Sequence, residues 1–231
     1  MYKKIGIIGG LSPESTVLYY LKITRLYVEM FGECAYPDII IYSVNLENYH
    51  KWRALNRWDL VINDLVMVTE KLKLSGADFC IIATNTIHKV FKEVVEQTQM
   101  PFLHILEPVI TKIKQSGIDK VGLLGTQFTM SDNFYKDILS ENGISCVVPD
   151  NPEQEFIQNT IVNQLVKGII DPISKQKFVE IIRNLTRNGA GGIILGCTEI
   201  PLLINQPDCD VPVFDTAIIH AEAALHYAIK T

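Results

Sequence analysis

The chain has 231 residues, of which 48% are hydrophobic and 20% charged, a balance that can support one large or two small folded domains. Its net charge of −5, without a long basic run, argues against nucleic acid or an anionic membrane surface as a partner. No apolar run approaches the roughly 20 residues that span a bilayer, and the N-terminus lacks the features of a secretory signal. The five cysteines show neither CxxC nor metal-ligand spacing, so we expect a reduced, cytoplasmic protein with free thiols and no metal.

The first half of the chain alternates apolar strand patterns with helical periodicity. The strands are predicted at residues 4–8, 38–44, 79–83 and 102–105. The isoleucine run at 39–41 is too continuous for a half-exposed strand, so we expect it to be buried. Ser12 and Pro13 suit the N-cap and first position of a helix that begins at residue 13. The further helices are predicted at 60–72, 86–96 and 108–115. Residues 45–56 are polar and aromatic, and we expect a loop that reaches over a site.

The second half repeats this alternation. Its strands are predicted at 120–124, 144–148, 192–197 and 211–214, and its helices at 131–141, 153–167, 174–187 and 216–229. Strands that alternate with helices indicate parallel sheets with right-handed crossovers. We expect the last helix to pack on the first half. The predicted lobes are therefore 1–107 plus about 209–231, and 108–208.

The two halves share an internal repeat. Residues 4–9 (KIGIIG) match 120–125 (KVGLLG), and residues 76–88 align without a gap on 189–201. In these registers Tyr19 meets Tyr135, and Thr84 falls opposite Cys197. We therefore expect an α/β fold of two similar lobes related by a pseudo-two-fold axis, each a parallel sheet flanked by helices. Such an arrangement would place Thr84 and Cys197 on opposite sides of an active site between the lobes.

Cys197 is the strongest candidate for chemistry. It lies at the carboxyl end of a predicted buried strand, directly before Thr198 and Glu199, which could begin a helix. Open α/β sheets bind ligands at this position, and a helix N-terminus favours a thiolate, which can act as a nucleophile or a base. A buried, inert thiol is the ordinary alternative, and we accept it for Cys80 and Cys146.

Thr84 has weaker intrinsic chemistry. A hydroxyl is a poor base but can donate a proton to a carbanion, directly or through water. The residue could instead simply cap a helix. His88 lies one helical turn beyond it and could orient or titrate near a site, although a core histidine is an equal alternative.

Several further positions could bind an anion. The turns at 9–12 and 125–129 offer backbone N–H groups, but the sequence contains neither common phosphate-loop motif, so a carboxylate fits better. Arg53 could hold a carboxylate bidentately and Lys167 as a point charge. Taken alone, each of these cations is more commonly a solvated surface charge.

Four segments together resemble the aspartate/glutamate racemase family, its aspartate racemase branch most closely, over nearly the whole chain. They are residues 7–16 (IIGGLSPEST), 85–88 (NTIH), 124–126 (LGT) with Thr129-Met130, and 195–201 (LGCTEIP). The resemblance implies a cofactor-independent enzyme of two similar lobes, often a homodimer, whose substrate is a small acidic amino acid. In this family two cysteines flank Cα, and one removes a proton while the other returns a proton to the opposite face.

The resemblance carries the second cysteine over to Cys197, which would act on the L-isomer. The first carries over to Thr84, where this sequence departs from the pattern. The resemblance also implies two groups of substrate-binding residues. Gly10, Leu11, Asn85, Thr86, Thr126, Thr198 and Glu199 would hold the α-amino and α-carboxylate groups, and Arg53 and Lys167 the side-chain carboxylate.

Two other functions stay open at this point. A single thiol that faces a non-thiol could serve a cofactor-free decarboxylase or a maleate-type isomerase of a small dicarboxylate. Alternatively, the lobes could bind an acidic amino acid without turnover. The sequence does not decide between aspartate and glutamate.

Overall fold

The computed structural model describes residues 2–230, which form two compact α/β units. The first unit comprises the chain up to Ile105 together with the chain from Ala217 onward, and the second comprises Leu106–Thr216. Residues 106–107 and 209–216 thus belong to the second unit, whereas the sequence had placed them in the first. The reason for the latter is a strand: Val213–Asp215 pairs in parallel with Gly192–Gly196.

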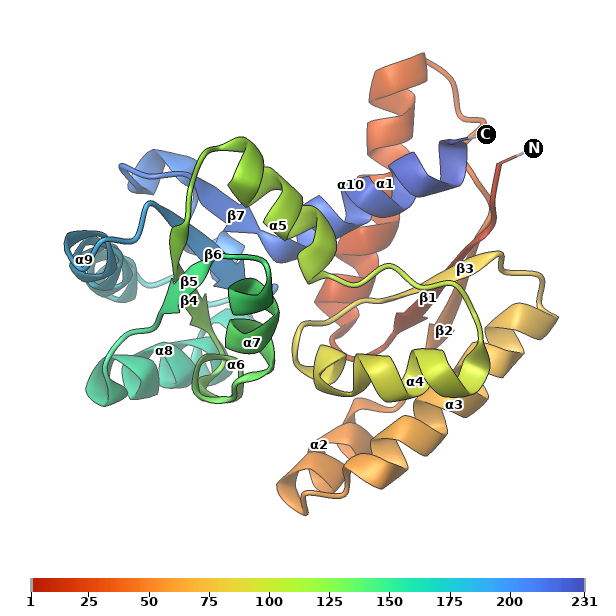
Figure 1. The fold of residues 1–231 in the computed structure, drawn as a ribbon, viewed down its shortest axis with the longest axis horizontal. Coiled ribbons are helices and arrows are strands. Elements are labelled where there is room, and N and C mark those ends of the chain that lie inside the picture. The colour runs from red at the N-terminus through yellow and green to blue at the C-terminus, as the bar shows by residue number, and fades with distance from the viewer. Residues whose placement is uncertain (1, 231) are drawn as a thin grey trace. The chain divides into compact units, whose positions relative to one another are not determined.

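The first unit contains a three-stranded parallel sheet in the order β2-β1-β3 (Figure 1). Its strands are β1 (Ile5–Gly9), β2 (Ile39–Ser43) and β3 (Phe79–Ile82). The predicted strand at 102–105 is only a single parallel bridge between Phe102 and Cys80. β2 is an edge strand, and Ile41 is 39% exposed, so the expectation of a buried strand there is wrong.

Side chains of β1 and β3 alternate between the two faces of this sheet. Ile5, Ile7 and Ile81 pack against α1 (Pro13–Phe31) and α10 (Thr216–Ile229), so the last helix packs on the first half as predicted. Ile8 and Ile82 pack on the other face, against α3 (Trp58–Leu74), η1 (Thr86–Val90) and α4 (Phe91–Thr98). Both faces of the sheet are therefore covered, which leaves its carboxyl edge for chemistry.

One predicted loop is a helix. Residues 46–54 form α2 (Leu46–Ala54), and the Asn45 side chain caps it by accepting a 3.0 Å hydrogen bond from the Glu47 N–H. Only Tyr49 of this helix is buried, because α2 lies on the outside of α3 with one ring turned inward. The helix carries Arg53 in its last turn.

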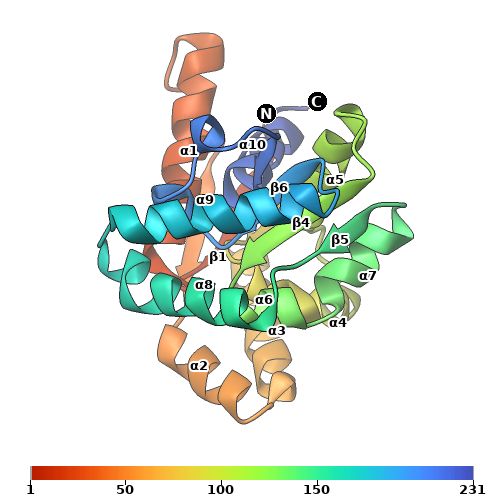
Figure 2. The ribbon, with the colours of Figure 1, turned by 90° about the vertical axis from the view of Figure 1, so that its left-hand side faces the viewer.

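The second unit contains a four-stranded parallel sheet in the order β5-β4-β6-β7. Its strands are β4 (Lys120–Gly125), β5 (Ser145–Val147), β6 (Gly192–Gly196) and β7 (Val213–Asp215). Figure 2 shows α8 (Asn151–Asn163) and α9 (Pro172–Arg187) side by side across one face of it. The remaining helices are α5 (Leu106–Gln115), α6 (Gln127–Ser131), α7 (Phe134–Glu141), and the short 3₁₀ turns η2 (Leu165–Lys167), η3 (Ile200–Leu202) and η4 (Gln206–Asp208).

The internal repeat is present in the strand orders. β2-β1-β3 of the first unit corresponds to β5-β4-β6 of the second, and the aligned Tyr19 and Tyr135 are both fully buried. The aligned Gly76 and Gly189 have φ angles of 93° and 92°, a left-handed conformation that favours glycine. Thr84 and Cys197 consequently follow equivalent strands, β3 and β6. No helix within residues 2–230 has the length and apolar character that a membrane span requires.

Candidate active site

The end of β6 presents Cys197 in a polar but buried setting. Its Sγ donates a hydrogen bond to Oε2 of Glu199 at 2.9 Å, and the Thr198 hydroxyl donates to the same oxygen at 2.9 Å. Cys197 and Glu199 are 7% and 8% exposed. The three consecutive polar residues therefore form one hydrogen-bonded unit centred on a carboxylate oxygen.

This setting holds Cys197 as a thiol. Burial raises the pKa of Cys197 well above its usual value, and the negative charge of Glu199 adds to that rise. The expectation that a helix N-terminus would lower this pKa is wrong. The helix that follows is only η3, three residues long, and the opposing hydrogen bonds from the backbone N–H groups of Glu199 and Ile200 are smaller effects.

Packing around β6 fixes where the chain delivers the thiol. The Thr216 hydroxyl donates to the Leu195 carbonyl at 2.9 Å inside the core. Gly196 is closely packed, because a Cβ there would lie 3.2 Å from the Leu124 carbonyl oxygen, tighter than an ordinary contact. Thr126 follows Gly125, the residue of β4 that pairs with Gly196, and caps α6 by accepting from the Thr129 N–H at 3.3 Å. Thr126 and Cys197 are thus brought to one edge of this sheet.

The end of β3 presents Thr84 in the first unit. The Ser15 hydroxyl, buried at the start of α1, donates to the Ala83 carbonyl at 2.8 Å, and the Thr84 N–H donates to the Ile82 carbonyl at 2.9 Å. Thr84 is half-buried, and its own hydroxyl forms no hydrogen bond within residues 2–230. The backbone on either side of Thr84 is therefore fixed, whereas the hydroxyl is available to a ligand.

A model of the family described as "Asp/Glu/Hydantoin racemase" matches residues 8–224. The chain belongs to this family. Thr84 and Cys197 therefore lie at the two equivalent strand ends of a chain from the racemase family.

The similarity to individual relatives extends over 96% or more of this chain. It is 26% identical to a broad specificity amino-acid racemase of Bacillus subtilis strain 168, across 96% of both chains. Its fold matches a candidate Asp/Glu racemase from Yersinia pestis at 40% identity and a TM-score of 0.94, covering 99% of this chain and 100% of that one. It also matches an aspartate racemase homologue from Pyrococcus horikoshii OT3 at 38% identity and a TM-score of 0.89, with the same coverage.

The other residues that the sequence predicted to bind substrate differ in exposure. Asn85 and Thr86 are buried directly after Thr84, and Leu11 is buried beyond the end of β1. Arg53 is half-buried on α2, where burial lowers the pKa of its guanidinium, while Lys167 is exposed at the end of η2. These residues remain predicted contacts.

The turn after β1 is more occupied than the sequence implied. The Gly10 N–H donates to the Thr16 hydroxyl at 2.8 Å, so this donor is already used within the turn. Gly10 has φ 78°, and a Cβ there would collide with the backbone N and O of Val44. The glycine is therefore required by close packing between the ends of β1 and β2.

Sequence reasoning missed a cluster of three buried histidines behind Thr84. The ring centroid of His88 lies 4.8 Å from that of His104 and 5.9 Å from that of His220. These residues are far apart in sequence, so no local pattern could reveal the cluster. No group of three His, Cys, Asp or Glu side chains within residues 2–230 is arranged to hold a metal.

Proposed function

We propose that this protein is a cofactor-independent racemase of acidic amino acids, aspartate or glutamate, in which Cys197 acts on the L-isomer and Thr84 on the opposite face of Cα. The observation that carries the proposal is the buried Cys197–Glu199 pair, which follows the central strand of a racemase-family chain. Thr84 follows the equivalent strand of the first unit, β3, which ends at Ile82. The mechanism requires both side chains to reach one bound substrate.

The first step needs a thiolate from a thiol whose resting pKa is high. Glu199 supplies the acceptor, because the thiol proton already points at its carboxylate oxygen 2.9 Å away. When that proton moves to Glu199, the Cys197 thiolate takes the proton from Cα of the L-substrate. The C–H bond breaks, its electron pair stays on Cα and spreads into the α-carboxylate, and an S–H bond forms.

The second step returns a proton to the other face. The Thr84 hydroxyl, or a water that it holds, donates to the carbanion, and solvent then restores the hydroxyl proton. Glu199 releases to solvent the proton that it took from Cys197, so all three side chains return to their starting protonation states. A hydroxyl is a poor base, so the reverse abstraction from the D-isomer has a higher intrinsic barrier. The free enantiomers have equal energy, so kcat/KM is still equal in the two directions, and only kcat and KM separately can differ.

Substrate recognition in this proposal uses the remaining predicted residues. Asn85, Thr86, Thr126 and Thr198 hold the α-amino and α-carboxylate groups, together with the turn at Gly10 and Leu11. Arg53 and Lys167 neutralise the side-chain carboxylate. The partly desolvated Arg53 is suited to this task, because a guanidinium binds a carboxylate through two parallel hydrogen bonds.

The decisive experiment is proton NMR of L-aspartate, and separately L-glutamate, with the protein in D₂O, followed by chiral chromatography. Loss of the Cα–H signal together with appearance of the D-isomer is the expected result for at least one substrate. Cys197→Ala should abolish both, whereas Thr84→Ala should lower D-isomer formation and leave exchange of the L-isomer. Retained exchange in Cys197→Ala would contradict the assignment of the base.

The other outcomes distinguish the alternatives. Exchange with complete retention of the L configuration would mean that Cys197 returns the proton to the face from which it came. No exchange of either amino acid would contradict racemisation of acidic amino acids and direct the assay to other amino acids and to small dicarboxylates. The homodimer and cytoplasmic location belong to the same proposal, and light scattering on the purified protein tests the first.

A further inference from the structure

The carbonyl of Thr84 has an unusual partner. Nδ1 of His88 lies 2.8 Å from the Thr84 carbonyl oxygen. A carbonyl oxygen can only accept a hydrogen bond, so Nδ1 of His88 carries the proton and donates it. The bond therefore fixes both the tautomer of His88 and the orientation of the peptide group that follows Thr84.

The local helix type explains why this carbonyl needs a side-chain partner. The segment after Thr84 is the 3₁₀ helix η1, and the His88 N–H donates to the Asn85 carbonyl at 3.1 Å. In an α-helix that N–H would have reached the Thr84 carbonyl instead. The imidazole thus replaces a missing backbone hydrogen bond at the residue that carries the proposed proton donor.

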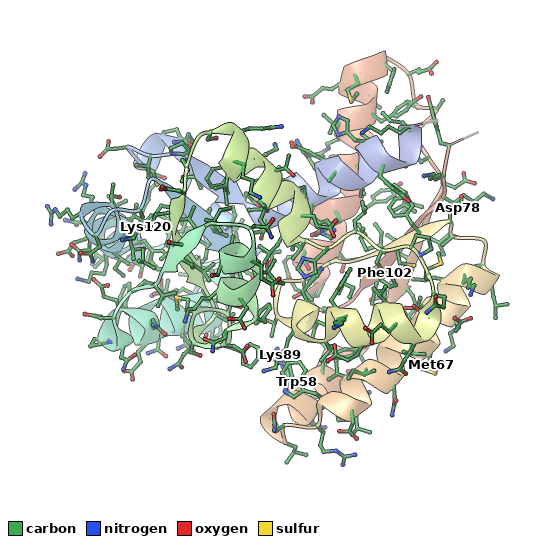
Figure 3. All side chains as sticks on the ribbon, in the orientation of Figure 1. Trp58, Met67, Asp78, Lys89, Phe102 and Lys120 are labelled. Atoms are coloured by element: carbon green, nitrogen blue, oxygen red, sulfur yellow. The ribbon has the colours of Figure 1, made fainter. Side chains whose placement is uncertain are left out.

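The His88 ring is held on several sides. It stacks on Phe91, with ring centroids 5.5 Å apart and planes within 11°, and it meets the rings of His104 and His220 edge to face. On the outside of η1, Lys89 places its Nζ 5.3 Å from the Trp58 ring centroid, and Figure 3 labels both side chains. The donor of the Thr84 carbonyl is therefore packed against three other rings.

Stability alone does not account for a histidine at this position. Nε2 of His88 is buried and has no hydrogen-bond partner within residues 2–230. Leaving such a group unsatisfied costs about 1–3 kcal/mol, more than one ordinary hydrogen bond contributes. An apolar residue would fill the same space without that cost, so the feature that distinguishes the histidine is its bond to Thr84.

We propose that His88 is a positioning residue for Thr84, whose Nδ1–H fixes the Thr84 peptide and so directs the hydroxyl at Cα of the substrate. This inference rests on the proposed racemase function. In the second half of the repeat, the position that corresponds to His88 is Pro201, which has no side-chain donor. A side-chain hydrogen bond of this kind is therefore found after Thr84 and not after Cys197. A hydroxyl has little intrinsic reactivity, and accurate placement is the contribution that the fold can add.

Two amide variants separate positioning from packing. In His88→Asn the amide nitrogen can occupy the place of Nδ1 and donate to the Thr84 carbonyl. In His88→Gln the side chain is one methylene longer. Its amide nitrogen therefore lies away from the place of Nδ1 and cannot donate to the Thr84 carbonyl without a shift of the surrounding rings. For each variant, exchange of Cα–H in the L-isomer and formation of the D-isomer are measured separately, together with thermal unfolding.

We expect His88→Gln to lower D-isomer formation by about 10- to 100-fold and to leave L-isomer exchange near the level of the unsubstituted protein. His88→Asn should restore D-isomer formation. Unchanged D-isomer formation in His88→Gln would overturn the inference. So would a result in which both variants unfold at lower temperature and lose L-isomer exchange and D-isomer formation to the same extent. If the unsubstituted protein shows no exchange at all, the proposed function itself fails.

A measurement without substitution tests the same contact. Nitrogen-15 NMR of histidine-labelled protein should show His88 neutral, with its proton on Nδ1 and protected from exchange. A proton on Nε2, or a charged ring at neutral pH, would overturn the inference even if the variants did not fold.

Discussion

Cys197 and Thr84 pose opposite acid–base problems at the scale of single residues. The thiol is intrinsically acidic enough to ionise, but burial and the charge of Glu199 hold it protonated. The hydroxyl is too weak an acid to ionise, but its backbone is fixed on both sides. In the proposed reaction, Thr84 depends on the fixed position of its backbone, and Cys197 depends on Glu199 as a neighbouring proton acceptor.

Glu199→Gln tests the role of the acceptor. The amide keeps the size of the side chain but is a far poorer proton acceptor, so we expect Cα exchange of the L-isomer to fall by about 100-fold or more. The same variant removes a neighbouring negative charge, so the pKa of Cys197 should fall. The difference in thiolate absorbance between each protein and its Cys197→Ala form measures that pKa across a pH titration.

Glu180→Gln is the matched control for this change, because Glu180 is an exposed carboxylate of the same unit that pairs with Lys177. It should leave both exchange and the Cys197 titration unchanged. An active Glu199→Gln protein would remove Glu199 from the proton path and leave it a substrate-binding residue only.

Thr84→Cys tests the weak half of the reaction. A thiol with a usual pKa of about 8.5 is a far better acid and base than a hydroxyl, so we expect kcat/KM to rise by about 10- to 100-fold in both directions. Thr84→Ser keeps the hydroxyl and should change kcat/KM little. Steady-state assays started from each enantiomer measure the rise, and no gain in Thr84→Cys would argue against action of this residue on Cα.

At the scale of secondary-structure elements, apolar periodicity made the strands and long helices predictable. The helix over 216–229 matches the structure, and the segments that the repeat aligns form corresponding strands, β1 with β4 and β3 with β6. Helix α2 was missed because only Tyr49 of its residues is buried, which leaves no apolar stripe to detect. The helix predicted over 131–141 begins only at Phe134, where the Asp132 side chain accepts from the Phe134 N–H at 3.1 Å, and a separate short helix, α6, precedes it.

The candidate residues could be named from the sequence, whereas the chemical properties of their surroundings could not. Motifs and the repeat singled out Thr84, Cys197 and Glu199, which the structure places after the expected strands. The high pKa of Cys197 depends on burial and on the rotamer of Glu199, which are three-dimensional properties. For His88 and Thr84, the sequence shows only that the two residues are four positions apart. It does not show that Nδ1 of His88 donates to the Thr84 carbonyl.

Gly10, in the turn after β1, and Gly32, the C-cap of α1, offer a matched pair of glycine substitutions. Gly10→Ala and Gly32→Ala both impose a left-handed backbone on alanine, at φ 78° and 72°. Nothing lies within 4 Å of a Cβ at Gly32, so we expect a loss of about 1 kcal/mol in the free energy of unfolding. At Gly10 the collision with Val44 should add about 1–3 kcal/mol more, measured by urea denaturation. Equal losses of unfolding free energy in the two variants would show that the backbone at Val44 moves away from the added Cβ at little cost.

At the scale of the whole molecule, the two units repeat one strand order but differ in what lies behind the equivalent strand ends. Glu199 accepts the bond of Cys197 in the second unit, whereas neutral histidines lie behind Thr84 in the first. His220 donates from Nε2 to the Leu103 carbonyl at 3.0 Å and accepts at Nδ1 from the Tyr19 hydroxyl at 2.8 Å. A single neutral tautomer satisfies both bonds, so the cluster is built for uncharged rings.

This cluster should make the folded state sensitive to acid. Burial lowers the pKa of His104 from 6.5 to about 4 and that of His220 to about 3. In the unfolded chain both residues take up protons near pH 6.5, whereas in the folded protein they do not. The unfolded state therefore binds more protons in this range, and stability that is fully present above pH 6.5 falls as the pH falls toward about 4.

Each such histidine contributes a slope of about 1.4 kcal/mol per pH unit in that window. His104→Phe keeps an aromatic ring against Phe91 and removes one titrating group, so the slope of unfolding free energy against pH should decrease by that amount. Urea denaturation at a series of pH values measures the slope. An unchanged slope in His104→Phe would mean that the folded protein admits a charged ring at position 104, and the neutral-cluster interpretation would then be wrong for that residue.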